Sequence, residues 1–207
     1  MESSIGLETT VRWLTFIPII VCSVFGLGLT LAKWSQFRRQ LLPDDAVLGQ
    51  LRRLIEAGDV QAAAEQGLND AHRGSRLIAT AAQCAARPRE SVKEKVEMVG
   101  SQLSAEIEYG LGGLALLTAL GPLLGLLGTV VGIVLVFDRL AASGGAATAQ
   151  ELAGGIGTAL LTTIAGLCVG ILALVVHRYL SAGAERRISE LEAFGLLAVD
   201  LVKGDDH

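Results

Sequence analysis

The sequence predicts an all-α integral membrane protein whose three transmembrane helices extend into a small cytoplasmic helical bundle. Three observations support this class: long runs without charge, a high apolar content and an uneven distribution of basic residues. Of the 207 residues, 51% are hydrophobic and only 18% are charged, against roughly 25% charged in soluble domains. The charged residues are also clustered, so long stretches of the chain carry none.

Three charge-free runs cover residues 13–31, 109–137 and 152–176. A helix rises about 1.5 Å per residue and the hydrocarbon core is about 30 Å thick, so each run is long enough to span it. Buried helices of a soluble protein are the alternative, but a chain this short has too little polar protein to cover three of them. We therefore predict transmembrane helices at residues 13–32, 109–137 and 152–176.

The basic residues predict the orientation. Eleven of the seventeen Lys and Arg residues lie in segment 33–107, and the positive-inside rule places such a segment in the cytoplasm. The first span lacks a basic segment before it and a small-residue cleavage site, so we expect a retained anchor and not a signal peptide. The expected multi-pass order is an outer N-terminus (1–12), a cytoplasmic helical region (33–108), a short outer loop (138–151) and a cytoplasmic helical tail (177–207).

The cytoplasmic segments show helical periodicity broken by turn residues. Gly58 and Asp59 separate a first short helix from a second one, and a third is expected over 75–86. Ser91 and Glu94 have the spacing of a capping box. No proline or polar break follows, so we expect one continuous helix over 92–137, with the C-terminal tail packed beside it.

The second and third spans each carry small residues on one face. The spacing of four, three and four residues places the glycines of the second span on one side of a helix, and small residues allow helices to approach closely in lipid. A proline in the same span removes a backbone hydrogen bond and can kink the helix. The predicted packing residues are Gly121, Pro122, Gly125, Gly128 and Gly132 in the second span and Gly155, Gly166 and Gly170 in the third.

Four threonines lie among these glycines: Thr129, Thr158, Thr162 and Thr163. A hydroxyl in hydrocarbon needs a partner, which its own helix, a neighbouring helix or water can supply. The residues alone leave two interpretations open. The threonines either hold a helix bundle together, or they line a narrow polar pore formed by several subunits.

The segments LGPLLGLLGTVVGIVLVF and LAGGIGTALLTTIAGLCVGI, together with GDVQAAAE, resemble the MotA/TolQ/ExbB proton channel family, most of all its three-span ExbB/TolQ branch. The resemblance implies a homo-oligomeric ring, typically of five, around two copies of a single-span ExbD/TolR/MotB-type partner whose membrane Asp carries the proton. Such motors use the ion-motive force to energise envelope transport or related mechanical work. By motif, Thr129 and Thr163 match the pore-lining threonines.

One position departs from the family pattern. ExbB and TolQ chains carry a Glu five residues before the threonine matched by Thr163, and this chain has Thr158 there. The adjacent pair Thr162 and Thr163 resembles sodium-driven members, and hard cations prefer oxygen ligands. Proton conduction, sodium conduction and a non-conducting structural scaffold therefore all stay open, with Thr129, Thr158, Thr162 and Thr163 as the candidate ion pathway.

Other functional classes find little support in the sequence. The three cysteines (Cys22, Cys84 and Cys168) have no disulfide or metal-ligand spacing. The segment GGIG lies inside an apolar run, so it does not resemble a phosphate loop. The basic residues are interleaved with acidic ones, unlike a nucleic-acid-binding patch. We therefore expect no enzyme activity, cofactor, metal site or nucleic-acid partner, and a lipid bilayer as the surroundings.

Overall fold

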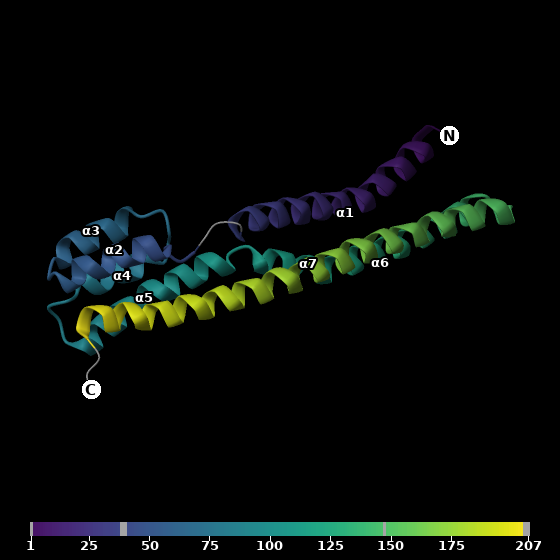
Figure 1. Cartoon of the computed structure of the whole chain (residues 1–207). Helices are drawn as coiled ribbons and strands as arrows, with labels where there is room; N and C mark the ends of the chain where they lie inside the picture. The colour runs from purple at the N-terminus through teal and green to yellow at the C-terminus, as the bar shows by residue number, and fades with distance from the viewer. Residues whose placement is uncertain (1, 38–40, 147, 205–207) are drawn as a thin grey trace. The chain divides into compact units, whose positions relative to one another are not determined.

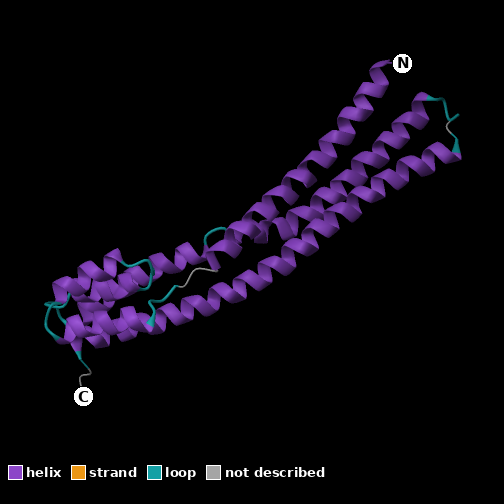
Figure 2. Ribbon diagram, turned by 45° about the horizontal axis from the view of Figure 1, so that its top comes forward, coloured by secondary structure: helices purple, strands orange, loops and turns teal. Residues whose placement is uncertain are grey.

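The computed structural model describes residues 2–37, 41–146 and 148–204, with side chains described from Phe16 onward except Gln36. This part of the chain contains seven α-helices and no strand (Figure 1, Figure 2), so the all-α class is confirmed. The helices are α1 (Glu2–Phe37), α2 (Asp45–Glu56), α3 (Val60–Asn69), α4 (Ser75–Gln83), α5 (Arg89–Glu108), α6 (Leu111–Ala142) and α7 (Ala149–Lys203). The predicted segments extend over residues 1, 38–40, 147 and 205–207, which lie outside the described residues.

Three stretches are long and apolar enough to cross a membrane: Phe16–Ser35, Arg89–Ala142 and Ala149–Lys203. The second and third stretches contain the predicted spans 109–137 and 152–176, and the first overlaps the predicted span 13–32 over residues 16–32. Many of their large apolar side chains are exposed in the single chain, among them Val24 (66%), Leu126 (56%) and Leu172 (67%). Surface of this kind is stable in hydrocarbon or against another membrane helix, because no water contacts it there.

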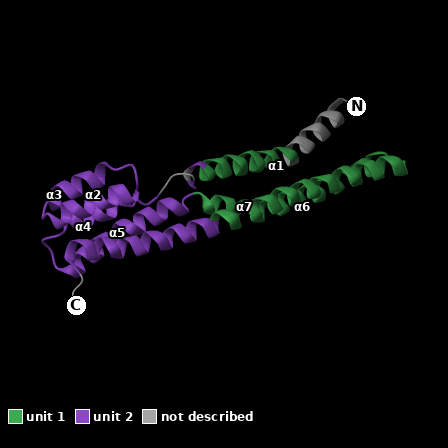
Figure 3. Cartoon of the chain, viewed as in Figure 1, with its two compact units in different colours: residues 1–34, 110–180 green, residues 35–109, 181–207 purple. Residues whose placement is uncertain are grey.

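The chain forms two compact units (Figure 3). The membrane unit comprises residues 1–34 and 110–180, and the bundle unit comprises residues 35–109 and 181–207. In the membrane unit, α1 packs against α6, since a Cβ added at Gly26 would lie 3.0 Å from a Leu117 methyl group. The rings of Trp34 and Tyr179 also stack, with centroids 6.4 Å apart.

The expected continuous helix over 92–137 is wrong, because Gly110 separates α5 from α6. Its φ of 87° lies in the left-handed region, which glycine adopts without steric cost. The expected capping box is wrong too. Helix α5 begins at Arg89, directly after Pro88, so Ser91 already lies inside the first turn.

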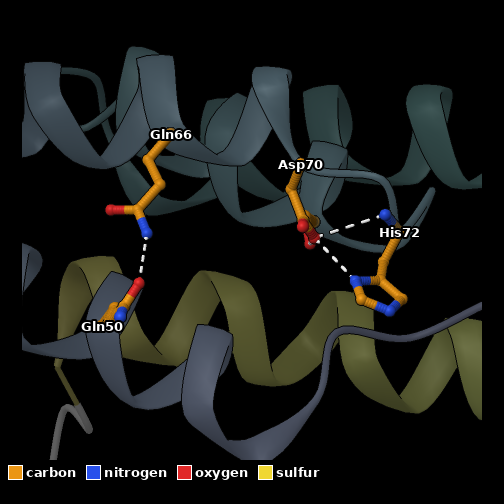
Figure 4. Close-up of polar contacts among 5 residues, drawn as sticks. Gln50, Gln66, Asp70 and His72 are labelled. Carbon is orange, nitrogen blue, oxygen red and sulfur yellow. Dashed lines mark hydrogen bonds and ion pairs between the residues drawn. The ribbon is translucent and has the colours of Figure 1, made fainter.

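The bundle unit is built around α3 and α4. Side chains of Ala63, Ala64 and Ala82 form a small buried cluster, and Leu77 and Ile78 are fully buried. Asp59 accepts a hydrogen bond from the backbone N–H of Ala62 (3.0 Å) and so caps α3. Gln66 of α3 donates to Gln50 of α2 at 2.7 Å (Figure 4).

The C-terminal part of α7 packs against α5 within this unit, as the sequence predicts. A Cβ at Gly195 would lie 3.4 Å from a Val96 methyl group. Arg89 forms an ion pair with Asp200 and donates to the carbonyl of Gly204 at 2.8 Å. The tail is therefore held at its end by polar contacts and along its length by apolar ones.

The turn between α3 and α4 connects three parts of the bundle unit. The carboxylate of Asp70 accepts hydrogen bonds from Ser75 and from the backbone N–H of His72, and it lies 3.0 Å from His72 Nδ1 (Figure 4). Arg73 pairs with Glu106 of α5, and the N–H of Gly74 donates to Leu41 in the segment after α1 (2.8 Å). Burial raises the pKa of Asp70, but the bonds from Ser75 and His72 outweigh it and hold the pKa below its ordinary value.

Candidate functional site

Helices α6 and α7 touch backbone to backbone in the membrane unit. A Cβ added at Gly121 would lie 2.8 Å from the carbonyl oxygen of Gly166, and one added at Gly125 would lie 3.0 Å from the carbonyl oxygen of Thr162. Real Cβ atoms do not approach neighbours below about 3.0 Å. Any larger residue at Gly121 would therefore push the helices apart, so the close contact depends on glycine.

The other predicted packing residues lie along the same contact. Gly128 faces the Thr162 side chain, and Gly155 faces Val136. A Cβ at Gly132 would lie 2.6 Å from the Ala159 methyl group, and one at Gly170 would lie 2.6 Å from the Pro122 ring. The structure thus brings the eight predicted packing residues together on the facing sides of α6 and α7.

Most threonine hydroxyls of the two spans donate to their own helix. Such bonds run from Thr118 to Ala115, Thr129 to Leu126, Thr158 to Gly154 and Thr162 to Ala159, at 2.7–2.9 Å. A hydroxyl that donates its only proton to a carbonyl of the preceding turn needs no further acceptor in hydrocarbon.

Thr163 is different, because its hydroxyl reaches across to α6. Its Oγ1 lies 3.1 Å from the carbonyl oxygen of Gly125 and 3.3 Å from Thr129 Oγ1. Thr162 Oγ1 also lies 3.4 Å from the same carbonyl. We call these four oxygens, from Gly125, Thr129, Thr162 and Thr163, the hydroxyl cluster.

The hydroxyl cluster has more acceptor capacity than protons. Two of its three hydroxyl protons are donated outside it, to the carbonyls of Leu126 and Ala159. Each hydroxyl oxygen has two lone pairs, so lone pairs of Thr129 remain beside the single proton of Thr163, while the Gly125 carbonyl also accepts the N–H of Thr129 within α6. An arrangement of this kind attracts a donor or a cation.

The burial of the four candidate threonines differs. Thr129 and Thr162 are buried, with 8% and 3% of their surface exposed, whereas Thr163 is half-buried. Thr158 is exposed in the single chain. Its hydroxyl donates to Gly154 of its own helix, so it does not belong to the hydroxyl cluster. It lines a cavity of about 430 Å³ that also reaches Thr162.

Two charged residues of this cavity, Glu151 and Arg139, are not among the site residues predicted from the sequence. Thr148 donates to the Glu151 carboxylate through both its N–H and its hydroxyl (2.9 Å each), and the N–H of Glu151 donates back to Thr148 Oγ1 (3.2 Å). These bonds form a capping box at the start of α7, and they lower the pKa of Glu151. The spacing T-x-x-E over 148–151 was the sequence signal that could have identified it.

The fold and these contacts define an integral membrane protein with three spanning helices, in which the second and third pack through glycines around a cluster of hydroxyls. Among the described residues no three His, Cys, Asp or Glu side chains lie together. Around Thr163 the polar atoms at the contact of α6 with α7 are hydroxyls and backbone carbonyls, and this chemistry agrees with the family that the comparisons identify.

Residues 60–193 match the model of the MotA/TolQ/ExbB proton channel family, which covers more than half of the chain. The chain belongs to that family. It is 30% identical over 183 residues to a putative biopolymer transport protein, ExbB-like 1, from Synechocystis, with 86% of this chain and 71% of the relative covered. It is 46% identical over 83 residues to biopolymer transport protein exbB1 from Vibrio cholerae.

The matched stretch covers 39% of this chain and only 36% of the Vibrio protein. A putative ExbB homolog from Methanothermobacter thermautotrophicus is 27% identical over 175 residues, which are 84% of this chain and 62% of the relative. The likeness therefore extends over most of this chain, while two of these three relatives have at least a third of their length outside it.

Proposed function

We propose that this chain is the channel-forming subunit of a membrane motor driven by the ion-motive force, and that it conducts protons together with a single-span partner. The observation that carries this proposal is the position of Thr163. Its hydroxyl lies within hydrogen-bonding distance of Gly125 and Thr129 across the contact of two spans. Membership in a proton channel family supports the same function.

The residue types of the two spans imply that this chain supplies hydroxyls and that the partner supplies the proton-binding group. The predicted second and third spans, 109–137 and 152–176, contain no carboxylate. A group that binds and releases protons near neutral pH must then come from another chain, and an Asp in the span of an ExbD/TolR/MotB-type protein has the right chemistry. The hydroxyl cluster would hold a proton-carrying water beside that Asp. One proton crossing 100 mV releases about 2.3 kcal/mol, enough to bias a conformational step.

The proposed assembly is a homopentameric ring around two copies of the partner, in the bacterial inner membrane. The N-terminus would lie in the periplasm, and segment 33–108 and the tail in the cytoplasm, because the Lys and Arg residues are concentrated there. The motor would energise envelope transport or related mechanical work. The relatives' names, biopolymer transport proteins, agree with such a role.

Sodium conduction is a second candidate, and the hydroxyl cluster itself favours it. The carbonyl oxygen of Gly125 lies near both Thr162 Oγ1 and Thr163 Oγ1, so several neutral oxygens converge on one point. Hard cations prefer such ligands. The two candidates share the same residues and differ in the ion that they carry.

The test is ion flux through the complete chain, reconstituted in liposomes with its single-span partner. Thr129→Val and Thr163→Val keep the side-chain shape and remove the hydroxyl. Losing a hydrogen bond worth about 1.4 kcal/mol in the barrier would lower proton flux about tenfold. Thr118→Val is the matched control, because the Thr118 hydroxyl donates only to its own helix at Ala115.

Three outcomes separate the candidates. Proton flux that falls in both cluster variants and not in the control supports the proposal. Flux that follows a sodium gradient at constant pH assigns sodium instead. Absence of ion flux in the unmodified complex, with the assembly intact by native mass spectrometry, would leave the non-conducting scaffold and overturn the proposal. Flux that is unchanged in both cluster variants would overturn the role of Thr129 and Thr163 in conduction.

A further inference from the structure

The cavity of about 430 Å³ in the membrane unit joins a charged end to the hydroxyl cluster. Its lining includes Thr158 and Thr162 of α7, Gly128 of α6 and Phe16 of α1. Glu151 and Arg139 also line it, and both flank the connection between α6 and α7. Thr162 belongs to the cavity lining and to the hydroxyl cluster, so the two features adjoin at this residue.

The α7 residues of the cavity lie on one helix face. Glu151, Gly155, Thr158 and Thr162 all line the cavity and are spaced four, three and four residues apart. At 1.5 Å per residue the eleven steps from Glu151 to Thr162 correspond to about 16 Å along the helix. The cavity therefore carries polar side chains from the connection inward, to a depth of roughly half the hydrocarbon core.

The cavity lining itself holds one base and one acid, Arg139 and Glu151, and the connection beside it has a negative balance. The connection 138–151 contains Asp138 and Glu151 against the single base Arg139. The Glu151 carboxylate accepts two hydrogen bonds from Thr148, and these hold its pKa below the ordinary value. The carboxylate is therefore ionised at neutral pH, which favours cations over anions near the opening.

We propose that this cavity admits a monovalent cation, hydronium or sodium, and that Glu151 attracts it toward Thr158 and Thr162. This inference rests on the proposed function for the direction in which the ion then moves. It adds a cation-collecting residue and a defined route from the connection to the hydroxyl cluster. Arg139 opposes Glu151 in this cavity, so the two side chains together set how strongly cations are favoured.

A purely structural role of Glu151 makes a different prediction, because the residue also closes a capping box. Gln serves as well as Glu in that motif, so Glu151→Gln keeps the hydrogen bonds with Thr148 and removes the charge. If Glu151 acts only as a cap, this substitution changes nothing in the cavity.

The experiment measures the charge preference of the cavity without measuring conduction. Thr158→Cys is introduced into the full chain after Cys22, Cys84 and Cys168 are each replaced by Ala, and the protein is placed in lipid nanodiscs, where both membrane faces are open. The modification rates with a trimethylammonium and a sulfonate methanethiosulfonate reagent are then compared. We expect the cationic reagent to react faster.

The variants give the quantitative test. At about 10 Å in water one charge changes the ratio of cationic to anionic rates about fourfold. Glu151→Gln is expected to lower the ratio by this factor, and Arg139→Gln to raise it. At Val175→Cys the ratio should be insensitive to both. Val175 is exposed on α7, outside the cavity lining, and about 36 Å along the helix from Glu151, a distance at which salt screens the charge.

The outcomes decide the inference independently of the proposed function. A ratio at Thr158→Cys that Glu151→Gln leaves unchanged, or a thiol that reacts with neither reagent, would overturn it. Slower modification in sodium than in choline at equal ionic strength assigns sodium, and equal rates assign hydronium. If the charge preference is found but the reconstituted complex conducts no ions, the cavity stands and the proposed function fails.

Discussion

Thr163 differs from its neighbours in where its hydroxyl proton goes. Thr118, Thr129, Thr158 and Thr162 donate to carbonyls of their own helix, whereas Thr163 reaches a carbonyl and a hydroxyl of α6. The sequence places five threonines in two spans but does not separate them, because donation within a helix and across helices needs the same residue type. Only the packing of α6 on α7 distinguishes Thr163.

The sequence predicts that the glycines behind this packing share one helix face. It does not predict at which of them the neighbouring helix comes closest. Gly121 and Gly157 are both glycines in apolar spans, yet a Cβ at Gly121 would meet backbone atoms at 2.8 Å and one at Gly157 would meet nothing within 4 Å. Periodicity identifies which residues share a side of a helix. It does not identify how close the neighbouring backbone comes.

Gly121→Ala and Gly157→Ala test this difference as a matched pair. We expect Gly121→Ala to destabilise the chain by about 1–3 kcal/mol, since the backbone of α7 must move away. Gly157→Ala should be neutral or stabilising by up to about 1 kcal/mol, because Ala is the better helix former. The free energy of unfolding in detergent, followed by circular dichroism, measures both. Equal effects would contradict the close approach seen at Gly121.

Asp70 gives a pH-dependent prediction for the turn between α3 and α4. Its folded pKa is lowered by bonds from Ser75 and His72, so its contribution to stability is present above the unfolded pKa of about 3.9. That contribution is lost as the pH falls through the lower folded value. Asp70→Asn should then cost about 1 kcal/mol at pH 7, and the difference from the unmodified chain should shrink below pH 4. A difference that stays constant from pH 7 to pH 3 would rule out the charged form as its source.

At the level of the elements, the membrane spans could be predicted well and the junction between α5 and α6 could not. Long charge-free runs leave few alternatives to a spanning helix. The junction contains Gly110, Gly112 and Gly113, which are alike in sequence. Only Gly110 has a positive φ, and a Cβ there would come within 3.5 Å of Lys33 in α1. The packing of α1 thus contributes to the environment of the break, which no local pattern records.

A second matched pair tests the break. Gly110→Ala forces a side chain into the left-handed region, which costs roughly 1–2 kcal/mol. Gly112→Ala lies in the first turn of α6 with nothing within 4 Å, so it should be neutral or slightly stabilising. Thermal unfolding of the full chain in detergent compares them. If Gly110→Ala is as stable as the unmodified chain, α5 and α6 can join into one helix and the break is not required.

The charged residues of the cavity are also features of the elements that could not be predicted from the sequence as site residues. Glu151 directly precedes the charge-free run 152–176, and Arg139 follows Asp138, the residue that ends the run 109–137. In the sequence these flanking charges serve only to delimit the spans. Glu151 and Arg139 line the same cavity because α6 and α7 pack side by side in the membrane unit (Figure 1). The capping box formed by Thr148 and Glu151 has a recognisable spacing, but its proximity to Thr158 follows only from the continuity of α7 across residue 151.

At the level of the whole molecule, a single chain does not suffice for the proposed function. Its predicted second and third spans hold hydroxyls and carbonyls but no carboxylate, and large apolar side chains on all three spans are exposed. Gly154 of α7 has no neighbour within 4 Å in the single chain, so another helix can approach it closely. Both features agree with an assembly in which further copies and a partner complete the pathway.

Native mass spectrometry of the chain purified in mild detergent is therefore expected to give a homopentamer, and co-expression with the single-span partner should add two copies of it. An Asp→Asn variant of the partner's membrane residue should preserve this stoichiometry and abolish proton flux, because the amide cannot take up the proton. Monomers or dimers alone would contradict the ring. A complex that conducts equally well with the Asn variant would place the proton-binding group elsewhere. Residues outside the predicted spans, Glu151 among them, would then be the next candidates in this chain.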